Sequence, residues 1–182
     1  MNFKTALLAA MTCGAIATPS WAQTSLRPPS VPLVTHDPFL SIWSNTNNLY
    51  DSSTAHWTGR AQGISSLVRI DGKPFRLMGD TPTQFAPLPQ TNVSVTPTRT
   101  IYTFIGEGVK VKLTFLSPLI PSDLDLLSRP LSYITWDVEA TDGARHDVSV
   151  YFDASSALAV NEPSLAYSVR TTKFACASTP CT

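Results

Sequence analysis

Residues 56–79 read HWTGRAQGISSLVRIDGKPFRLMG, and this stretch decides the fold. Two short apolar runs, ISSLVRI and KPFRLM, flank the dipeptide Asp71-Gly72. Asp-Gly between two strand-forming runs is the strongest local signal for a β-hairpin. A type I′ turn needs φ > 0 at both central residues, and Asp and Gly tolerate this conformation best. The stretch therefore predicts a hairpin over residues 63–79.

The five residues His56-Trp57-Thr58-Gly59-Arg60, which precede the predicted hairpin, form a polar and aromatic cluster. In one interpretation Trp57 folds back onto the sheet, since aromatic side chains bury large apolar areas. In the other, the segment is an exposed loop that contacts a ligand or another domain, because Trp and Arg are enriched at interface hot spots. We predict a domain-contact loop with His56, Trp57 and Arg60 as candidate contact residues and Arg60 paired across the interface.

The N-terminus has the pattern of a secretory signal peptide. A short positive region ends at Lys4, an uncharged apolar run follows, and Ser20-Trp21-Ala22 places small residues at the −3 and −1 positions of a cleavage site. The apolar run is shorter than the about 20 residues that span a bilayer. We expect residues 1–22 to be removed, together with Cys13, and the mature protein to be exported to the periplasm or the extracellular space.

Charge and composition exclude two classes of partner. The full chain has 13 basic and 13 acidic residues, and loss of the signal peptide removes a single lysine and no acid. A nearly neutral chain without a basic run offers no electrostatic footprint for nucleic acid. It also lacks the Lys/Arg-rich amphipathic helix of a membrane-surface protein. We therefore expect neither nucleic acid nor a membrane as a partner.

Short apolar runs separated by turn signals follow a Pro-rich lead-in at residues 23–38. Besides the hairpin, strands are expected at Phe39–Trp43, Arg99–Ile105, Val109–Leu116, Leu131–Ala140 and Arg145–Asp153. The clearest is Val109–Leu116, in which apolar and polar residues alternate with a period of two. Successive hairpins without intervening helices predict an antiparallel all-β sandwich over residues 39–162.

The sandwich is expected to be incomplete. From residue 163 onward the alternation is weak and no closing strand is evident, which would leave a sheet edge open. Residues 163–182 are interpreted as a divergent tail, and we expect the chain to be the front part of a longer protein. Cys176 and Cys181 could close a small disulfide loop in an oxidising compartment. Alternatively they stay unpaired, because so short a loop strains the bond geometry.

No sequence motif for catalysis or metal binding is present. The chain has no Gly-rich phosphate loop, HExxH, GxSxG or CxxC pair. His36, His56 and His146 are far apart in sequence and are expected to be structural or solvated, with His146 at the edge of the core. Asp123 and Asp125 are expected to begin a turn or a short helix. We predict no catalytic residue, no metal site and no cofactor in this chain.

A series of motifs resembles the secreted glutaminase A-like proteins of bacteria and fungi. The motifs occur in order between residues 27 and 162. They are VPLVTHDPFLSIWS (31–44), HWTGR (56–60), LVRIDGK (67–73), LMG (77–79), TPTRTIYTF (96–104), LTFLSP (113–118), SRP (128–130) and VYFD (150–153). Because so many segments match in order, the resemblance is specific.

This resemblance implies an N-terminal β-sandwich that precedes a helical toroid similar to that of six-hairpin glycosidases. The family's hydrolytic site is assigned to the toroid, and none of its catalytic residues falls on a matching position here. The chain would then be the non-catalytic sandwich portion of an exported amidohydrolase that converts L-glutamine to L-glutamate and ammonia. Its expected partners are the missing helical-toroid catalytic domain and, for the full-length protein, a small-molecule substrate.

Two other functions stay open. A sandwich attached to such a toroid can bind carbohydrate through exposed tryptophans, whose apolar faces stack on sugar rings. Trp43, Trp57 and Trp136 are the candidates, although Trp136 alternates in phase with Ile134 and Val138 and is expected in the core. The sandwich can also be purely structural and shield one face of the catalytic domain. Fold resemblance alone does not separate these functions.

Overall fold

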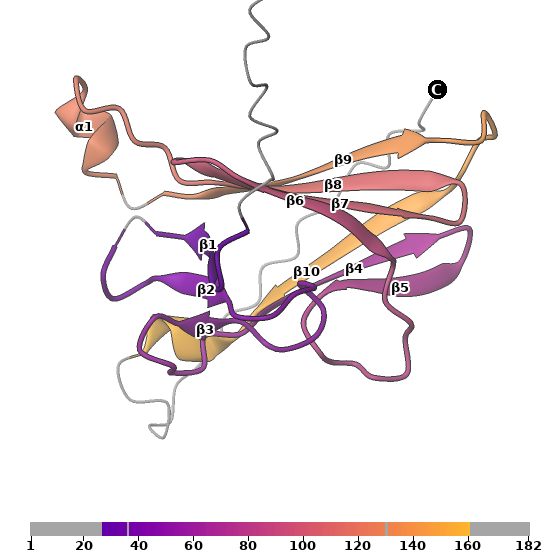
Figure 1. The fold of residues 1–182 in the computed structure, drawn as a ribbon, viewed down its shortest axis with the longest axis horizontal. Helices are drawn as coiled ribbons and strands as arrows, with labels where there is room; N and C mark the ends of the chain where they lie inside the picture. The colour runs from indigo at the N-terminus through magenta and orange to yellow at the C-terminus, as the bar shows by residue number, and fades with distance from the viewer. Residues whose placement is uncertain (1–26, 36, 130, 161–182) are drawn as a thin grey trace, which may run out of the picture.

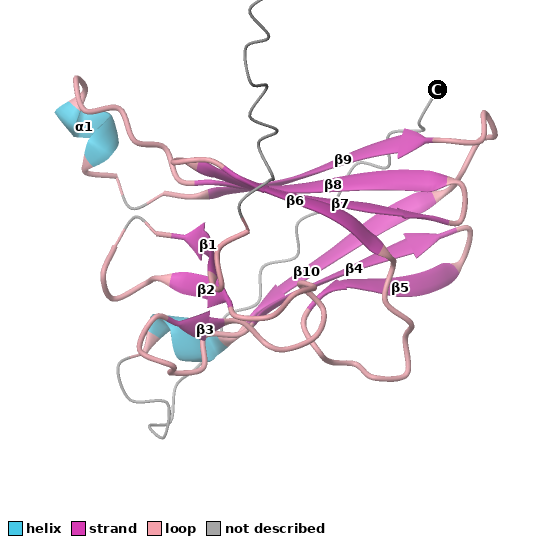
Figure 2. Ribbon diagram, viewed as in Figure 1, coloured by secondary structure: helices cyan, strands magenta, loops and turns pink. Residues whose placement is uncertain are grey.

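The computed structural model describes residues 27–160 except residues 36 and 130. Its elements, in chain order, are β1 (Val31–Val34), β2 (Ile42–Ser44), β3 (Ala55–His56), β4 (Ile64–Ile70), β5 (Lys73–Met78), β6 (Gln90–Val95), β7 (Arg99–Gly106), β8 (Val109–Leu116), α1 (Leu124–Leu127), β9 (Tyr133–Ala140), β10 (Val148–Ala154) and the 3-10 helix η1 (Ser156–Ala159). The described part of the chain is therefore almost entirely β (Figure 2).

The predicted hairpin is present and consists of β4 and β5. Its strands pair in antiparallel fashion from Ile70 opposite Lys73 onward, with an irregularity between Ser66 and Leu67. Asp71 has φ = 48° and Gly72 has φ = 85°. Both central residues thus adopt the left-handed conformation that a type I′ turn requires. The local signal in the sequence was sufficient to place this turn.

Two antiparallel sheets face each other and form the sandwich (Figure 1). One has the strand order β6-β7-β8-β9, and the other has the order β10-β4-β5. A third sheet, β1-β2-β3, lies at one end of the two layers, where β1 packs against β7 and β8. The prediction of an antiparallel all-β sandwich is confirmed.

Alternating side chains build the core between the layers. In β8, Val109, Val111, Leu113 and Phe115 are buried, as their period of two predicts. Tyr102 of β7 is also buried and meets the ring of Phe115 edge-on, with 6.3 Å between ring centroids. Edge-to-face aromatic contacts of this kind add to the stabilisation that burial alone provides.

The first strand lies earlier in the chain than the sequence indicates. β1 pairs with β2 with Pro32 opposite Trp43, whereas Phe39, the expected start of the first strand, is outside any strand. Pro32 is tolerated because β1 is an edge strand of its sheet. The Thr100 hydroxyl donates a hydrogen bond of 2.7 Å to the Pro32 carbonyl and ties this sheet to β7.

Trp136 lies between the two layers, as its phase predicts. Its indole N–H donates a hydrogen bond of 3.1 Å to the Ser66 hydroxyl of β4, and its ring meets Phe152 of β10 edge-on at 5.7 Å. Because β10 is an edge strand, Phe152 and Val150 remain partly exposed. The edge strands β9 and β10 are therefore linked by the contact between Trp136 and Phe152. Trp136 also ties β9 to β4, the central strand of the other sheet.

Helix is confined to short segments within the described residues. Asp123 caps α1, because its carboxylate accepts a hydrogen bond of 2.9 Å from the Leu126 backbone N–H. This agrees with the expected role of Asp123 at the start of a helical turn. Neither of the described helices is long or apolar enough to cross a membrane.

His146 joins separate turns at one end of the sandwich. The strand β10 begins at Val148 and not at Arg145, so His146 precedes the strand and does not belong to it. Its side chain is 11% exposed and lies at the edge of the core, beside Val109 and Val138. Its Nδ1 lies 2.7 Å from Asp71 Oδ2, and its Nε2 lies 3.1 Å from both carboxylate oxygens of Asp142. Two carboxylates need two N–H donors, and only the protonated imidazole supplies both.

The electrostatics of this cluster follow from its hydrogen bonds. The contacts with Asp71 and then Asp142 raise the pKa of His146 above its usual value. The contact with His146 lowers the pKa of Asp71, and hydrogen bonds from the Ala144 backbone and from His146 lower that of Asp142. The cluster is therefore held together by the attraction between a positively charged imidazole and two carboxylates. Asp71 belongs to the β4-β5 turn, and Asp142 belongs to the connection between β9 and β10.

We predict that His146→Gln destabilises the chain more at about pH 5 than at about pH 9. The folded-state pKa of His146 is raised, so its contribution to stability is fully present below the usual value of 6.5 and is lost as the pH rises through the folded-state pKa. Both carboxylates, whose pKa values are lowered, stay ionised over this range. Urea unfolding of both chains at the two pH values measures the effect.

Lys73→Gln is the matched control for this experiment. Lys73 forms an exposed ion pair of 2.8 Å with Glu107, and this contact raises the pKa of Lys73 above its usual 10.5. The lysine stays charged at both pH values, so the effect of its substitution is expected to be the same at each. A loss from His146→Gln that is equally independent of pH would contradict a charged cluster.

Candidate functional site

The predicted contact loop, residues 56–60, is a tight turn that begins at the end of β3. The Gly59 N–H donates to the His56 carbonyl at 2.8 Å, and the His56 N–H donates to the Arg60 carbonyl at 2.8 Å. Gly59 has φ = 87°, a backbone conformation that residues with a side chain rarely adopt. The backbone thus fixes the position of each side chain in the loop.

His56 is buried and serves as an anchor for the loop. Its Nε2 lies 2.9 Å from the Pro38 carbonyl and its Nδ1 lies 2.7 Å from the Thr58 hydroxyl. A carbonyl only accepts hydrogen bonds, so Nε2 carries the proton and Nδ1 accepts from Thr58. Both ring nitrogens are therefore engaged in holding residues 38 and 58, and this geometry suits a structural role.

Trp57 is 65% exposed, although its indole N–H reaches the Pro38 carbonyl at 3.3 Å. The neighbouring Phe39 is 88% exposed, and its own carbonyl accepts a hydrogen bond of 3.2 Å from the Gln62 side chain. The interpretation in which Trp57 folds onto the sheet is thus not the observed one. Two aromatic side chains are instead held outward by ordered backbone, as a contact surface requires.

Arg60 reaches to the last described residue. One guanidinium nitrogen donates a hydrogen bond of 3.2 Å to the Val160 carbonyl, 100 residues further along the chain. The candidate residues of the contact loop therefore lie beside the point where the chain continues to residue 161. Pairing of Arg60 across a domain interface stays a prediction, since the contact seen here is within the chain.

Most of the other predicted site residues fall outside the part of the chain that the structure describes. His36, Cys176, Cys181 and the signal peptide lie outside the described residues. His146 sits in the charged cluster described above. In the described part of the chain, no group of three or more His, Cys, Asp or Glu residues could hold a metal ion.

Of the three tryptophans considered as sugar platforms, Trp57 alone is mostly exposed. Trp43 is partly buried and its indole N–H donates a hydrogen bond of 2.8 Å to the Ser41 hydroxyl. Trp136 lies between the sheets. Neither ring offers a broad free face to a ligand.

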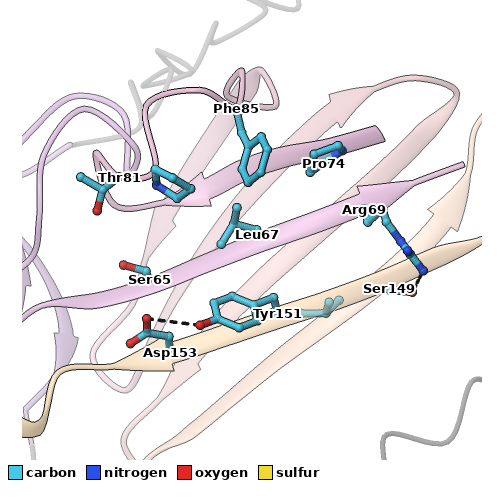
Figure 3. A pocket seen from close by; sticks show the side chains of 11 residues that line it. Ser65, Leu67, Arg69, Pro74, Thr81, Phe85, Ser149, Tyr151 and Asp153 are labelled. Carbon is cyan, nitrogen blue, oxygen red and sulfur yellow. Dashed lines mark hydrogen bonds between the residues drawn. The ribbon is translucent and has the colours of Figure 1, made fainter. Parts of the chain in front are cut away.

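A second candidate site, which the sequence did not indicate, is a groove of about 560 Å³ on the outer face of the β10-β4-β5 sheet (Figure 3). We call it the outer groove. Its apolar surface comes mainly from Leu67, Pro74, Pro82, Phe85 and Tyr151, and its polar groups include Ser65, Arg69, Thr81, Ser149 and Asp153. Its volume and mixed lining are typical of small-molecule sites in proteins.

The floor of the outer groove follows from strand register. Leu67 pairs with Tyr151, and Arg69 pairs with Ser149, so their side chains share one face of the sheet. This is the face opposite the core. The sequence predicted the hairpin that contains β4 and β5, but not that the outer face of this sheet would be concave.

Arg76 holds in place the connection between β5 and β6, which forms the remaining wall of the outer groove. Its guanidinium donates hydrogen bonds to the carbonyls of Phe85, Tyr50 and Gly79 at 2.9–3.0 Å. Its backbone also bonds to both Ala86 and Leu88 at 2.9 Å. The connection between β5 and β6 is thereby fixed beside the sheet, where it rises as a rim that carries Phe85 (Figure 3).

Two family models match the chain. Both are described as domains of unknown function, DUF4964 over residues 7–89 and DUF5127 over residues 98–179. Curated relatives carry more specific names. Glutaminase A of Aspergillus oryzae (strain ATCC 42149 / RIB 40) is 36% identical over 141 residues, which are 71% of this chain and 20% of the relative. A probable glutaminase of Arthroderma benhamiae (strain ATCC MYA-4681 / CBS 112371) is 28% identical over 162 residues, which are 79% of this chain and 18% of the relative.

The resemblance to glutaminase A-like proteins is confirmed by these relatives. The chain spans about a fifth of the length of the curated relatives it matches. No solved structure matches the chain.

We predict that Trp57→Ala changes the free energy of unfolding by less than about 1 kcal/mol, because its ring is exposed. The matched control is Trp136→Ala, which removes an aromatic side chain packed between the sheets and is expected to cost on the order of 3 kcal/mol. Urea unfolding of the two variants measures both values. A Trp57→Ala chain that fails to fold would show that Trp57 supports the core and would remove the contact-loop hypothesis.

Proposed function

We propose that this chain, a relative of glutaminase A, is the non-catalytic N-terminal β-sandwich of an exported glutaminase-like amidohydrolase. The observation that supports this most is the extent of the similarity, 36% identity over 71% of the chain but only 20% of the relative. Most of such a protein therefore lies outside the matched region, and we place the hydrolytic site there.

The described side chains are consistent with a supporting role. Hydrolysis of the glutamine side-chain amide adds water, forms the carboxylate of glutamate and releases ammonia, and it needs a base or nucleophile positioned at the carbonyl carbon. His56 holds two loops through both of its ring nitrogens. His146 is held between two carboxylates. Both described histidines therefore stabilise the fold.

The contact loop supplies a surface for the catalytic domain that we propose. Trp57 and Phe39 are exposed, and Arg60 contacts the Val160 carbonyl beside them. Interfaces are enriched in such aromatic and arginine side chains, which often supply most of the binding energy. In the longer protein, Trp57 would pack against the helical domain and Arg60 would pair with an acidic group or carbonyl of that domain.

We expect the purified chain to release no ammonia from L-glutamine above the buffer blank. Glutaminase A of Aspergillus oryzae serves as the positive control for the assay. The reason is that the proposal places the reacting groups outside this chain. Ammonia release by the pure chain that increases in proportion to its concentration would contradict the proposal, because the hydrolytic site would then lie within these 182 residues.

We also expect the exported chain to begin at Gln23. Expression in a bacterial host and sequencing of the N-terminus of the periplasmic product test this, since signal peptidase cleaves after a small residue such as Ala22. Ala22→Phe is the control and should leave the longer precursor in the cell. A wild-type product that retains Met1 would contradict the signal-peptide prediction.

A further inference from the structure

The outer groove is a built concavity that the proposed domain contact does not use. The outer face of a sheet is normally a solvated surface with alternating polar residues. Here that face carries Leu67 on its floor and Phe85 on its rim, and the rim is fixed by the three carbonyl contacts of Arg76. A concave surface held by ordered backbone suits ligand binding better than a flat face does.

Tyr151 forms a flat platform in this groove. It is 55% exposed, and its hydroxyl donates a hydrogen bond of 3.4 Å to Asp153 Oδ2, two residues along the same strand. A tyrosine hydroxyl reaches such a neighbour only if its ring lies along the strand. One face of the ring is therefore turned away from the sheet, as Figure 3 shows.

Charged groups of opposite sign stand at the two ends of the platform. Arg69 lies across β10 and donates a hydrogen bond of 3.4 Å to the Ser149 hydroxyl, while Asp153 lies beyond the hydroxyl end of Tyr151 (Figure 3). From Ser149 to Asp153 the strand advances about 13 Å at ~3.3 Å per residue. The groove is thus longer than one sugar ring and has no net charge from these two groups.

We propose that the outer groove binds a neutral oligosaccharide. The C–H face of a pyranose ring stacks on the exposed face of Tyr151, with Phe85 covering it from the rim. The Asp153 carboxylate accepts hydrogen bonds from sugar hydroxyls, and the Arg69 guanidinium, which has five N–H donors, donates to hydroxyl oxygens at the other end. Binding at this site is independent of the proposed amidohydrolase role.

The chemistry of the groove favours this ligand over others. A nucleic acid or an acidic peptide would place negative charge beside Asp153 without a surrounding excess of basic residues. A hydrocarbon chain would leave the charged groups at both ends desolvated without partners. A saccharide has apolar ring faces and hydroxyl-lined edges, and so it matches an aromatic platform that ends in polar groups.

The test is isothermal titration calorimetry of the full chain with four neutral hexasaccharides: cellohexaose, maltohexaose, xylohexaose and N-acetylchitohexaose. We expect at least one of them to bind. Tyr151→Ala should weaken this binding at least about tenfold, because the stacking platform is lost. Asp153→Asn, which keeps the size of the side chain but removes its charge, should weaken it to a smaller degree.

Tyr133→Ala is the matched control, because Tyr133 is 50% exposed on β9 and does not line the groove. It should leave the affinity unchanged. The proposal is overturned if none of the four sugars binds. It is also overturned if a sugar binds but Tyr151→Ala and Tyr133→Ala have equal effects, since binding would then lie elsewhere.

Discussion

Strand β4 contributes side chains both to the core and to the outer groove. Val68 and Ile70 point into the core between the sheets, while Leu67 and Arg69 point outward to the floor of the outer groove. Because side chains alternate along a strand, a slip of one residue between β4 and β10 would exchange these two surfaces. The turn at Asp71-Gly72 holds this register, together with the hydrogen bonds that the Asp71 carboxylate accepts from His146 and from the Asp147 backbone N–H.

Much of the fold could be predicted because its signals are local. Asp71-Gly72 specifies a turn on its own, and the alternation in Val109–Leu116 needs only one buried face. β1 escaped prediction because its proline argues against a strand unless the strand is known to lie at an edge. The start of β10 was placed too early, because His146 continues the apolar alternation in sequence but binds Asp71 and Asp142 instead.

The candidate sites also differ in whether their features have local signals in the sequence. Trp57 could be singled out from sequence because Trp beside His and Gly-Arg is unusual in a loop, yet nothing in the sequence revealed that His56 would anchor it to Pro38. The outer groove depends on contacts over longer separations. Leu67 and Tyr151 are paired although they lie 84 positions apart in the chain. The rim is held by Arg76, which binds backbone carbonyls, and no sequence motif marks such contacts.

The bond from Arg60 to the Val160 carbonyl also has a consequence for affinity. It fixes the exit of the chain beside Phe39 and Trp57, so whatever is joined to residue 160 by a short linker meets these rings at an effective concentration on the order of millimolar. Such an encounter is intramolecular and forgoes most of the entropic cost of bringing two separate molecules together. In the longer protein that we propose, two exposed aromatic rings would then be enough for a contact that would be too weak between free partners.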